Sequence, residues 1–467
     1  MNGRVTHPNL ADRAVAGDLD SDGDVDALVH LFPLNFGPST PITPAHGFGQ
    51  PIGTHSFGWR YLENITTTPG DPRFIDGAAG KMRNALGAYD PNWNRGLGMD
   101  VLADFDNNGA LDLYTTTGFA ATLSDVVNVQ MTDDLLFLNG VGGQPLGVLT
   151  ESGAQKLPPR CQDVVHDVPW DPAYISCGSF GLAQGDIDND GDADAVVTHF
   201  SQSGRTNYPW LLVNRFNEPV GKLVDEYPTR VPVNSLSGVI HTPAQDLNGN
   251  ATAGMDYAMF PALLDWDGDG DLDLALQVVQ DMPRMLENLG QDNNGDGLIN
   301  AADNSSLGTF ADVTPTLLAA LKPTTDSQDL VPVDIDGDGD FDLANDPFSD
   351  MVTIWRNDLQ PSALRAAVTE IWPRVGAKRG TVVRLHGVNL TNVAKVQFRF
   401  AGGTVCEQTA TAAVAGFPGT RLDVRIPATC PQTGLAQVRV LRSWTPPGCS
   451  NRVSFWSRQY FGYFVLR

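Results

Sequence analysis

Aspartate residues in this chain cluster in five nine-residue segments that share one spacing. The segments begin at Asp18, Asp104, Asp186, Asp265 and Asp334, so successive copies start 86, 82, 79 and 69 residues apart. Positions 1, 3, 5 and 9 carry a side-chain oxygen in every copy, and position 6 is always glycine. Alternating oxygen donors around a sharp turn suit a hard cation of calcium size, whereas Mg²⁺ demands a stricter octahedron. The five segments therefore predict calcium sites.

The candidate ligands lie at positions 1, 3, 5, 7 and 9 of each segment. Position 7 is Asp in four copies and Ala110 in the second, which favours a backbone carbonyl as the ligand there. No His or Cys lies in any segment, which disfavours zinc and softer metals. Asp-Gly clusters are also ordinary turn formers, but five copies in one context favour metal. The predicted ligands are Asp18, Asp20, Asp22, Asp24 and Asp26; Asp104, Asp106, Asn108, Ala110 and Asp112; Asp186, Asp188, Asp190, Asp192 and Asp194; Asp265, Asp267, Asp269, Asp271 and Asp273; and Asp334, Asp336, Asp338, Asp340 and Asp342.

A sixth segment, residues 292–303, fits the register of an EF-hand loop, with Gly297 at position 6. Its terminal Asp in place of Glu resembles dockerin-type loops, but a single copy without flanking helical patterns predicts no dockerin-like docking. The alternative is a plain polar turn. The candidate ligands are Asp292, Asn294, Asp296, Leu298, Asn300 and Asp303.

Short apolar runs flank every Asp-rich segment, so each segment is predicted to join two β-strands. A further apolar run later in each unit ends in an asparagine, and three units add a fourth run at residues 74–76, 148–150 and 310–314. The 48 glycines and 32 prolines also indicate a turn-rich, helix-poor chain. Four short strands per unit are typical of one β-propeller blade. The terminal asparagines of the third runs are Asn64, Asn139, Asn214, Asn288 and Asn357.

The repeated motif resembles the FG-GAP (integrin α-type) and VCBS repeats over residues 1–360. The resemblance implies a calcium-loaded β-propeller, with the side-chain ligands at positions 1, 3, 5 and 9. That family often has seven blades, whereas five longer units are visible here. We expect an all-β fold with about five blades, closed by a strand from residues 3–6, or up to seven if degenerate copies lie in the inserts. Residues 246–250 are one candidate for such a copy, with a polar turn as the alternative.

A second domain is predicted from residue 361. Residues 1–360 carry a net charge of −36 and residues 361–467 a net charge of +11. Alternating apolar residues with Gly-x-Asn turns, such as Gly387-Val388-Asn389, predict an antiparallel β-sandwich. This run resembles the IPT/TIG immunoglobulin-like domain, which implies a spacer or interaction module. The expected domains are a propeller over residues 1–360 and an Ig-like β-sandwich over residues 361–467.

Five cysteines are few for a disulfide scaffold. Cys161 and Cys177 could form a disulfide within one insert, and Cys406 could pair with Cys430, which leaves Cys449 unmatched. Disulfides and calcium sites of this kind are typical of proteins outside the cytosol. The first four residues lack the apolar segment of a secretion leader. The predicted location is extracellular or at the cell surface.

Several functional classes are disfavoured by the sequence. No Gly-x-Ser-x-Gly, His-Glu-x-x-His, P-loop or dinucleotide motif is present, so no catalysis is expected. The strongly acidic first domain would repel nucleic acid and anionic lipid, and no run of 18 apolar residues predicts a membrane span.

We therefore expect a non-enzymatic calcium-binding protein for adhesion, ligand binding or surface assembly, with a protein or glycan ligand. Two alternatives stay open. One is a structural subunit of an extracellular polymer or filament, whose acidic and basic domains associate head to tail. The other is a polysaccharide-active enzyme, a lyase or hydrolase, on a calcium propeller. Aromatic residues in or beside the long inserts are candidate ligand anchors, with core packing as the alternative; they are Trp59, Trp93, Trp170 and Tyr174.

Overall fold

The computed structural model shows an all-β chain. The statements below concern the residues that it describes, which are 10–22, 24–32, 58–67, 72–88, 99–116, 134–158, 178–200, 209–231, 258–267, 271–278, 284–290, 306–314, 327–333, 335, 341–347, 353–357, 367–372, 378–388, 390–391, 393–400, 404–409, 412–413, 421–431, 434–444, 453–456 and 465–466. Within them, the α-helices are single turns, and none is long and apolar enough to cross a membrane. The predicted all-β class is confirmed.

Each Asp-rich segment joins the first two strands of an antiparallel sheet, as the flanking apolar runs predict. We call the five sheets units 1 to 5 and the segments their Asp loops. Unit 1 contains β1 (Leu10–Gly17), β2 (Asp26–Phe32), β3 (Gly58–Asn64) and β4 (Phe74–Asp76). Unit 2 contains β6 (Asp100–Ala103), β7 (Asp112–Thr115), β8 (Leu135–Asn139) and β9 (Leu149–Glu151). A short strand, β5 (Met82–Arg83), extends the second sheet by pairing parallel to β9.

The later units repeat this order of strands. Unit 3 contains β10 (Gly178–Gly185), β11 (Asp194–Phe200), β12 (Trp210–Asn214) and β13 (Leu223–Asp225). Unit 4 contains β14 (Ala258–Leu264), β15 (Asp273–Val278), β16 (Arg284–Leu289) and β17 (Ser306–Asp312). Unit 5 contains β18 (Ser327–Val333), β19 (Asp342–Pro347) and β20 (Thr353–Trp355). Strand β13 had no counterpart among the fourth runs identified in the sequence.

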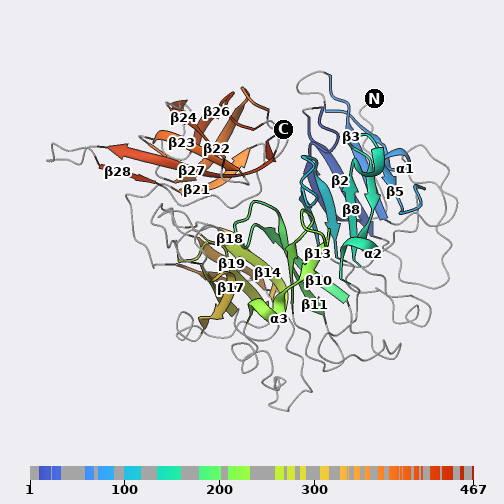
Figure 1. Cartoon of the computed structure of the whole chain (residues 1–467), viewed down its shortest axis with the longest axis horizontal. Helices are drawn as coiled ribbons and strands as arrows, with labels where there is room; N and C mark the ends of the chain where they lie inside the picture. The colour runs from blue at the N-terminus through green and yellow to red at the C-terminus, as the bar shows by residue number, and fades with distance from the viewer. Residues whose placement is uncertain are drawn as a thin grey trace, which may run out of the picture.

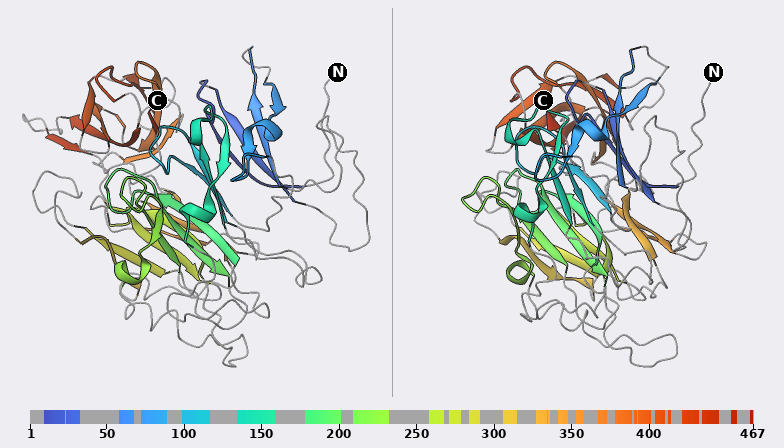
Figure 2. Two further views of the ribbon diagram at one scale, coloured as in Figure 1. Left: turned by 45° about the vertical axis from the view of Figure 1, so that its right-hand side comes forward. Right: turned by 90° about the vertical axis from the view of Figure 1, so that its right-hand side faces the viewer.

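Successive units pack on one another through their first strands. Strand β1 contacts β6, β6 contacts β10, β10 contacts β14, and β14 contacts β18. The side chains between the sheets form apolar clusters that each draw on neighbouring units, for example Leu19 with Leu113 and Ile187 with Leu286. Figures 1 and 2 show the sheets following one another in sequence order. Burial between sheets therefore holds the units together.

The outer faces of units 1 and 5 expose apolar side chains at positions that are buried elsewhere. Phe74 of unit 1 pairs with the last residue of β3 and is 47% exposed, whereas Leu149, Leu223 and Phe310 at the same place are fully buried. Ile335, at position 2 of the last Asp loop, is 43% exposed, whereas the residues at this position in units 1 to 4 are at most 5% exposed. At these positions, units 1 and 5 thus expose apolar side chains that the other units bury.

Residues from 367 onward form two further sheets around a separate core (Figure 1). One sheet has the order β21 (Ala367–Trp372), β22 (Val382–Val388), β26 (Arg421–Arg425) and β25 (Ala412–Ala413). The other has β24 (Val405–Thr409), β23 (Val393–Phe400), β27 (Gly434–Trp444) and β28 (Val453–Trp456), with β29 (Val465–Leu466) also paired to β27. The Cys406–Cys430 disulfide, one pairing that the sequence allowed, is present. Cys161, Cys177 and Cys449 lie outside the described residues.

Candidate metal centres

Among the described residues, four Asp loops each bring three carboxylates together, with one oxygen of each within 4.8 Å of the others. Unit 1 groups positions 1, 3 and 5, and units 2 to 4 group positions 1, 3 and 9. The converging carboxylates belong to the set of predicted ligands, but the sequence did not reveal which positions would converge. The clusters are Asp18, Asp20 and Asp22; Asp104, Asp106 and Asp112; Asp186, Asp188 and Asp194; and Asp265, Asp267 and Asp273.

The position 9 carboxylate connects each loop to the third strand of its unit. In unit 3, the backbone N–H of Ile187 donates to Asp194 Oδ2 at 2.8 Å, and the N–H of Asn214 donates to Asp194 Oδ1 at 2.7 Å. The same two bonds are made by the position 9 residue of every other unit. These carboxylates are at most 1% exposed. Position 9 therefore braces the loop as well as contributing oxygens to three of the clusters.

Backbone geometry explains the glycine at position 6. Gly109 and Gly191 have φ angles of 85° and 97°, a left-handed region that favours glycine. This turn lets their N–H groups donate to the position 1 carboxylates, at 2.8 Å to Asp104 and 3.0 Å to Asp186. The loop thus wraps around the first ligand residue before any cation binds.

Burial makes the acidic clusters electrostatically costly. Desolvation raises the pKa of Asp186 well above its usual range, and the charges of Asp190 and Asp188 raise it further. Desolvation followed by repulsion from Asp190 raises the pKa of Asp192 to about 10. The same effect of burial raises the pKa of Asp112, Asp194 and Asp273. A bound divalent cation would offset this repulsion.

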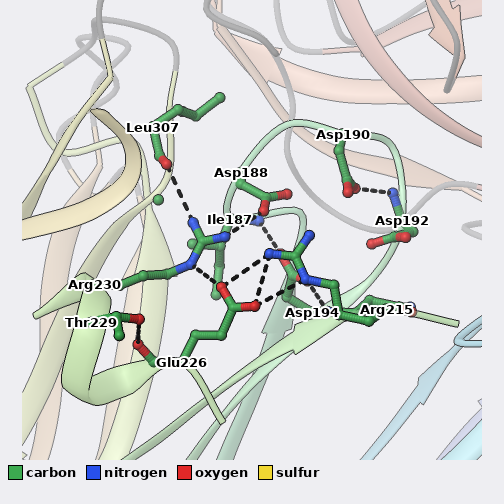
Figure 3. Close-up of polar contacts among 12 residues, drawn as sticks. Ile187, Asp188, Asp190, Asp192, Asp194, Arg215, Glu226, Thr229, Arg230 and Leu307 are labelled. Carbon is green, nitrogen blue, oxygen red and sulfur yellow. Dashed lines mark hydrogen bonds and ion pairs between the residues drawn. The ribbon is translucent and has the colours of Figure 1, made fainter. Parts of the chain in front are cut away.

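The donor atoms fit a hard cation. Among the described residues, Asp20 Oδ1, Asp188 Oδ1 and Asp192 Oδ1 are buried atoms without a hydrogen-bond partner. Asp192 as a whole is 7% exposed, and Figure 3 shows it with Asp188, Asp190 and Asp194 around the loop of unit 3. Buried carboxylate oxygens without donors are suited to Ca²⁺, which takes six to eight oxygen ligands in flexible geometry.

The other predicted ligands divide into two groups. The position 5 side chains Asp22, Asn108 and Asp190 are exposed, and each accepts the N–H of the residue at position 7; Asp22 also belongs to the unit 1 cluster. The position 7 residues Ala110, Asp192 and Asp271 are buried. Asp269, Asp334, Asp336, Asp338, Asp340 and the whole of the loop at residues 292–303 lie outside the described residues, as do Trp93, Trp170 and Tyr174.

The structure shows where Trp59 lies and what the repeated asparagines do. Trp59 is 2% exposed, and its ring lies 5.1 Å from that of His30 at a tilt of 55°, so it packs in the core and is not a surface anchor for a ligand. The asparagine that ends the third strand was visible as a repeat, but its role was not. In unit 3, Asn214 Nδ2 donates to Ala193 O at position 8 of its own loop, at 3.0 Å, and to Phe105 O of unit 2, at 2.8 Å.

The bond between units recurs along the chain. Asn139 donates to Leu19 O, Asn288 to Ile187 O and Asn357 to Trp266 O, always at position 2 of the preceding Asp loop. Each asparagine therefore joins two successive loops, and its own N–H bonds the position 9 carboxylate. The candidate metal loops and the contacts between units are one connected network.

Comparisons with known proteins do not assign the chain to a family. No protein-family model matches it, and no curated protein matches its sequence. Among solved structures, it is similar to the crystal structure of the Pseudomonas aeruginosa PilY1 C-terminal domain, with a TM-score of 0.25 and 12% sequence identity, over 96% of this chain and 84% of that chain. A likeness at this score carries no weight in the interpretation below.

Proposed function

We propose that the five units form a calcium-stabilised β-propeller of the FG-GAP/VCBS type that acts in extracellular binding, adhesion or surface assembly rather than in catalysis. The supporting observation is the recurrence of a partly buried carboxylate cluster at the same strand connection in four units. A single cluster would be weak support, because acidic turns are common. Four clusters with one hydrogen-bond pattern favour a shared ligand, and their oxygen-only donor set favours Ca²⁺.

In this proposal calcium has a structural role. The cation would bind carboxylates at positions 1 and 3 and at position 5 or 9, while the position 9 carboxylate also holds the third strand. The loops would then fix the sheets that carry a binding surface, because rigid scaffolds present functional loops. The ligand would be a protein or a glycan. Residues 361–467 would add an IPT/TIG-like module, and the Cys406–Cys430 disulfide is consistent with an extracellular location.

The proposal is tested by metal analysis of the purified full-length chain. After dialysis against calcium, we expect at least four Ca²⁺ per chain by elemental analysis, one for each described cluster. Asp188→Asn and Asp267→Asn should each reduce the count by about one. Arg384→Gln, which changes an ion pair with Asp423 in the C-terminal sheets, is the control and should leave the count unchanged. A wild-type chain that retains no Ca²⁺ would refute the proposal.

A second candidate, a structural subunit that associates with further copies, is supported by the apolar side chains exposed on the outer faces of units 1 and 5. Phe74 and Ile335 are exposed where their counterparts pack against a neighbouring unit. Packing of these faces between chains would repeat an interface that already occurs four times within the chain. Light scattering tests this: wild type should form larger species that Ile335→Asp abolishes. Leu86→Asp, at a residue that is 93% exposed, is the control. A monomeric wild type at high concentration would argue against it.

A further inference from the structure

Units 1, 2 and 3 place a basic residue at the same point relative to their Asp loops. Strands β4, β9 and β13 end at Asp76, Glu151 and Asp225, and each is followed by a one-turn helix. These helices are α1 (Ala78–Lys81), α2 (Gly153–Lys156) and α3 (Tyr227–Arg230). The fifth residue after each strand is therefore Lys81, Lys156 or Arg230, and it closes the helix. The recurrence is not evident from the loops themselves, because Lys81 and Arg230 lie 61 and 42 residues along the chain from Asp20 and Asp188, which they contact.

In units 1 and 3 this cation binds the carboxylate at position 3 of its own loop. Lys81 Nζ lies 2.7 Å from Asp20 Oδ2, and Arg230 Nη2 lies 2.9 Å from Asp188 Oδ2. Both pairs are largely buried, with side-chain exposures of 12% to 19%. The other oxygen of each carboxylate, Oδ1, is the buried atom that has no hydrogen-bond partner in the described structure. The cation therefore holds one oxygen and leaves the other available to a metal.

A second acidic residue fixes the cation in turn. Lys81 Nζ lies 3.1 Å from Glu63 Oε1, and Arg230 Nε donates to Glu226 Oε2 at 2.7 Å. Figure 3 shows Arg230 between Glu226 and Asp188, with Arg215 on the other side of Glu226. Two partners on each cation define its position more closely than one would.

The cations of units 2 and 3 donate hydrogen bonds to the following unit. Arg230 Nη1 donates to Leu307 O of unit 4 at 3.3 Å, and Lys156 Nζ donates to Gly221 O of unit 3 at 2.5 Å. Gly308 has a φ of 73°, and a Cβ there would collide with the Arg230 guanidinium. Gly147 of unit 2, with a φ of 85°, lies against Asp20 and Lys81 in the same way. Glycine at these turns lets the next unit approach the cation.

Lys156 completes the series at unit 2, with its ammonium 4.9 Å from the centre of the Phe216 ring. Burial raises the pKa of Asp106, and the positive charge of Lys156 partly offsets this effect. Its closest contact is with unit 3 rather than with its own loop, so its influence on Asp106 is through charge. Unit 4 differs in sequence, because the fifth residue after β17 is Leu317.

We propose that Lys81 and Arg230 are positioning residues that orient the position 3 carboxylates for metal binding and so couple occupancy of a metal site to the packing of the next unit. The inference rests on the proposed calcium function. The metal would hold Asp188 Oδ1, Arg230 holds Asp188 Oδ2, and the same guanidinium holds Leu307 O of unit 4. Removal of a residue that hydrogen-bonds to a metal ligand and orients it typically lowers metal affinity 10- to 100-fold.

The test compares Arg230→Met with Arg215→Met in the full-length chain. Both remove one guanidinium that contacts Glu226, but only Arg230 donates to Asp188 and Leu307. Calcium titration calorimetry should show one site weakened 10- to 100-fold in Arg230→Met and none in Arg215→Met. Arg230→Lys should restore part of the affinity. Lys81→Met provides the same test at unit 1 if the unit 3 variant fails to fold.

Hydrogen exchange distinguishes two roles for Arg230: coupling calcium binding to the packing of unit 4, or only holding units 3 and 4 together. Calcium should increase the protection of the peptide that contains β17 in wild type and in Arg215→Met, and this increase should be lost in Arg230→Met. If Arg230→Met binds calcium with unchanged affinity, Arg230 does not orient the metal ligand. If the variant loses the same protection of β17 with and without calcium, Arg230 only holds units 3 and 4 together. Either result would refute the coupling. Wild type that binds no Ca²⁺ would instead refute the proposed function, and the inference with it.

Discussion

Replacement of Asn214 by alanine should destabilise the acidic domain by removing a bond within unit 3 and a bond to unit 2. Its Nδ2 donates to Ala193 O at 3.0 Å and to Phe105 O at 2.8 Å, and Asn214 is 1% exposed. Alanine would leave both buried carbonyls without this donor. Each buried group left unsatisfied costs about 1–3 kcal/mol, so the expected loss is about 2–6 kcal/mol.

Asn64→Ala is the matched control. Asn64 occupies the same position in unit 1, and its Nδ2 donates to Val25 O of its own loop at 3.1 Å, which is its one bond of this kind among the described residues. In both asparagines, Oδ1 accepts the N–H two residues later, from Thr66 or Phe216. The two variants differ in the bond between units and in burial, since Asn64 is half-buried; we expect the bond between units to account for about 1–3 kcal/mol.

The assay is urea unfolding at saturating calcium, followed by tryptophan fluorescence and by far-UV circular dichroism. We compare transition midpoints of variants with similar slopes, because a chain with two domains need not unfold in one step. The midpoint of Asn214→Ala should lie clearly below that of Asn64→Ala, and both below wild type. Equal midpoints for the two variants would refute the conclusion that the asparagines hold successive units together.

Three further predictions concern metal, pH and redox state. At a hundredfold excess of calcium over its dissociation constant, each site stabilises the fold by about 2.7 kcal/mol, so chelation should lower the melting temperature; an unchanged melt after confirmed metal loss would contradict the metal assignment. Without metal, burial raises the pKa of Asp192 to about 10 and of Asp24 to about 6, so the folded state holds protons that the unfolded state has lost. The melting temperature in chelator should therefore rise as the pH falls from 8 to 5, and a decrease would contradict the burial of these carboxylates. Removal of the Cys406–Cys430 disulfide, which spans 24 residues, should destabilise the C-terminal sheets by about 3 kcal/mol, and an unchanged melt of the Cys406→Ser/Cys430→Ser variant would contradict this.

The loop pattern was predictable because it is local. Nine consecutive residues specify the oxygen donors and the glycine turn, and the apolar runs on either side specify the strands that carry them. The structure confirms strands on both sides of each segment and convergence of carboxylates such as Asp186 and Asp188. The Cys406–Cys430 pair was one pairing that the sequence allowed, but the structure decided it, because Cys449 is also close to Cys430 in sequence.

The fourth strand was less predictable. Strand β13 (Leu223–Asp225) was not identified, although the equally short β4 and β9 were, because a three-residue run carries too little periodicity to be distinguished consistently from a turn. The role of the repeated asparagine was equally hidden. Its spacing from the loop varies between units, and its partner in the preceding unit lies 109 residues away for Asn214 and 120 for Asn139.

The sequence alone determined the class of fold, the repeat and the chemistry of the loops, because these depend on residue type and short spacing. Only the tertiary structure decided which carboxylates are buried, which of their oxygens lack donors, and which distant residues hold them. Asp188 and Arg230 are 42 residues apart, yet their contact and that of Arg230 with Leu307 join a candidate metal loop to the next unit. Such contacts follow from the packing of one sheet against another, which no local pattern of residues encodes.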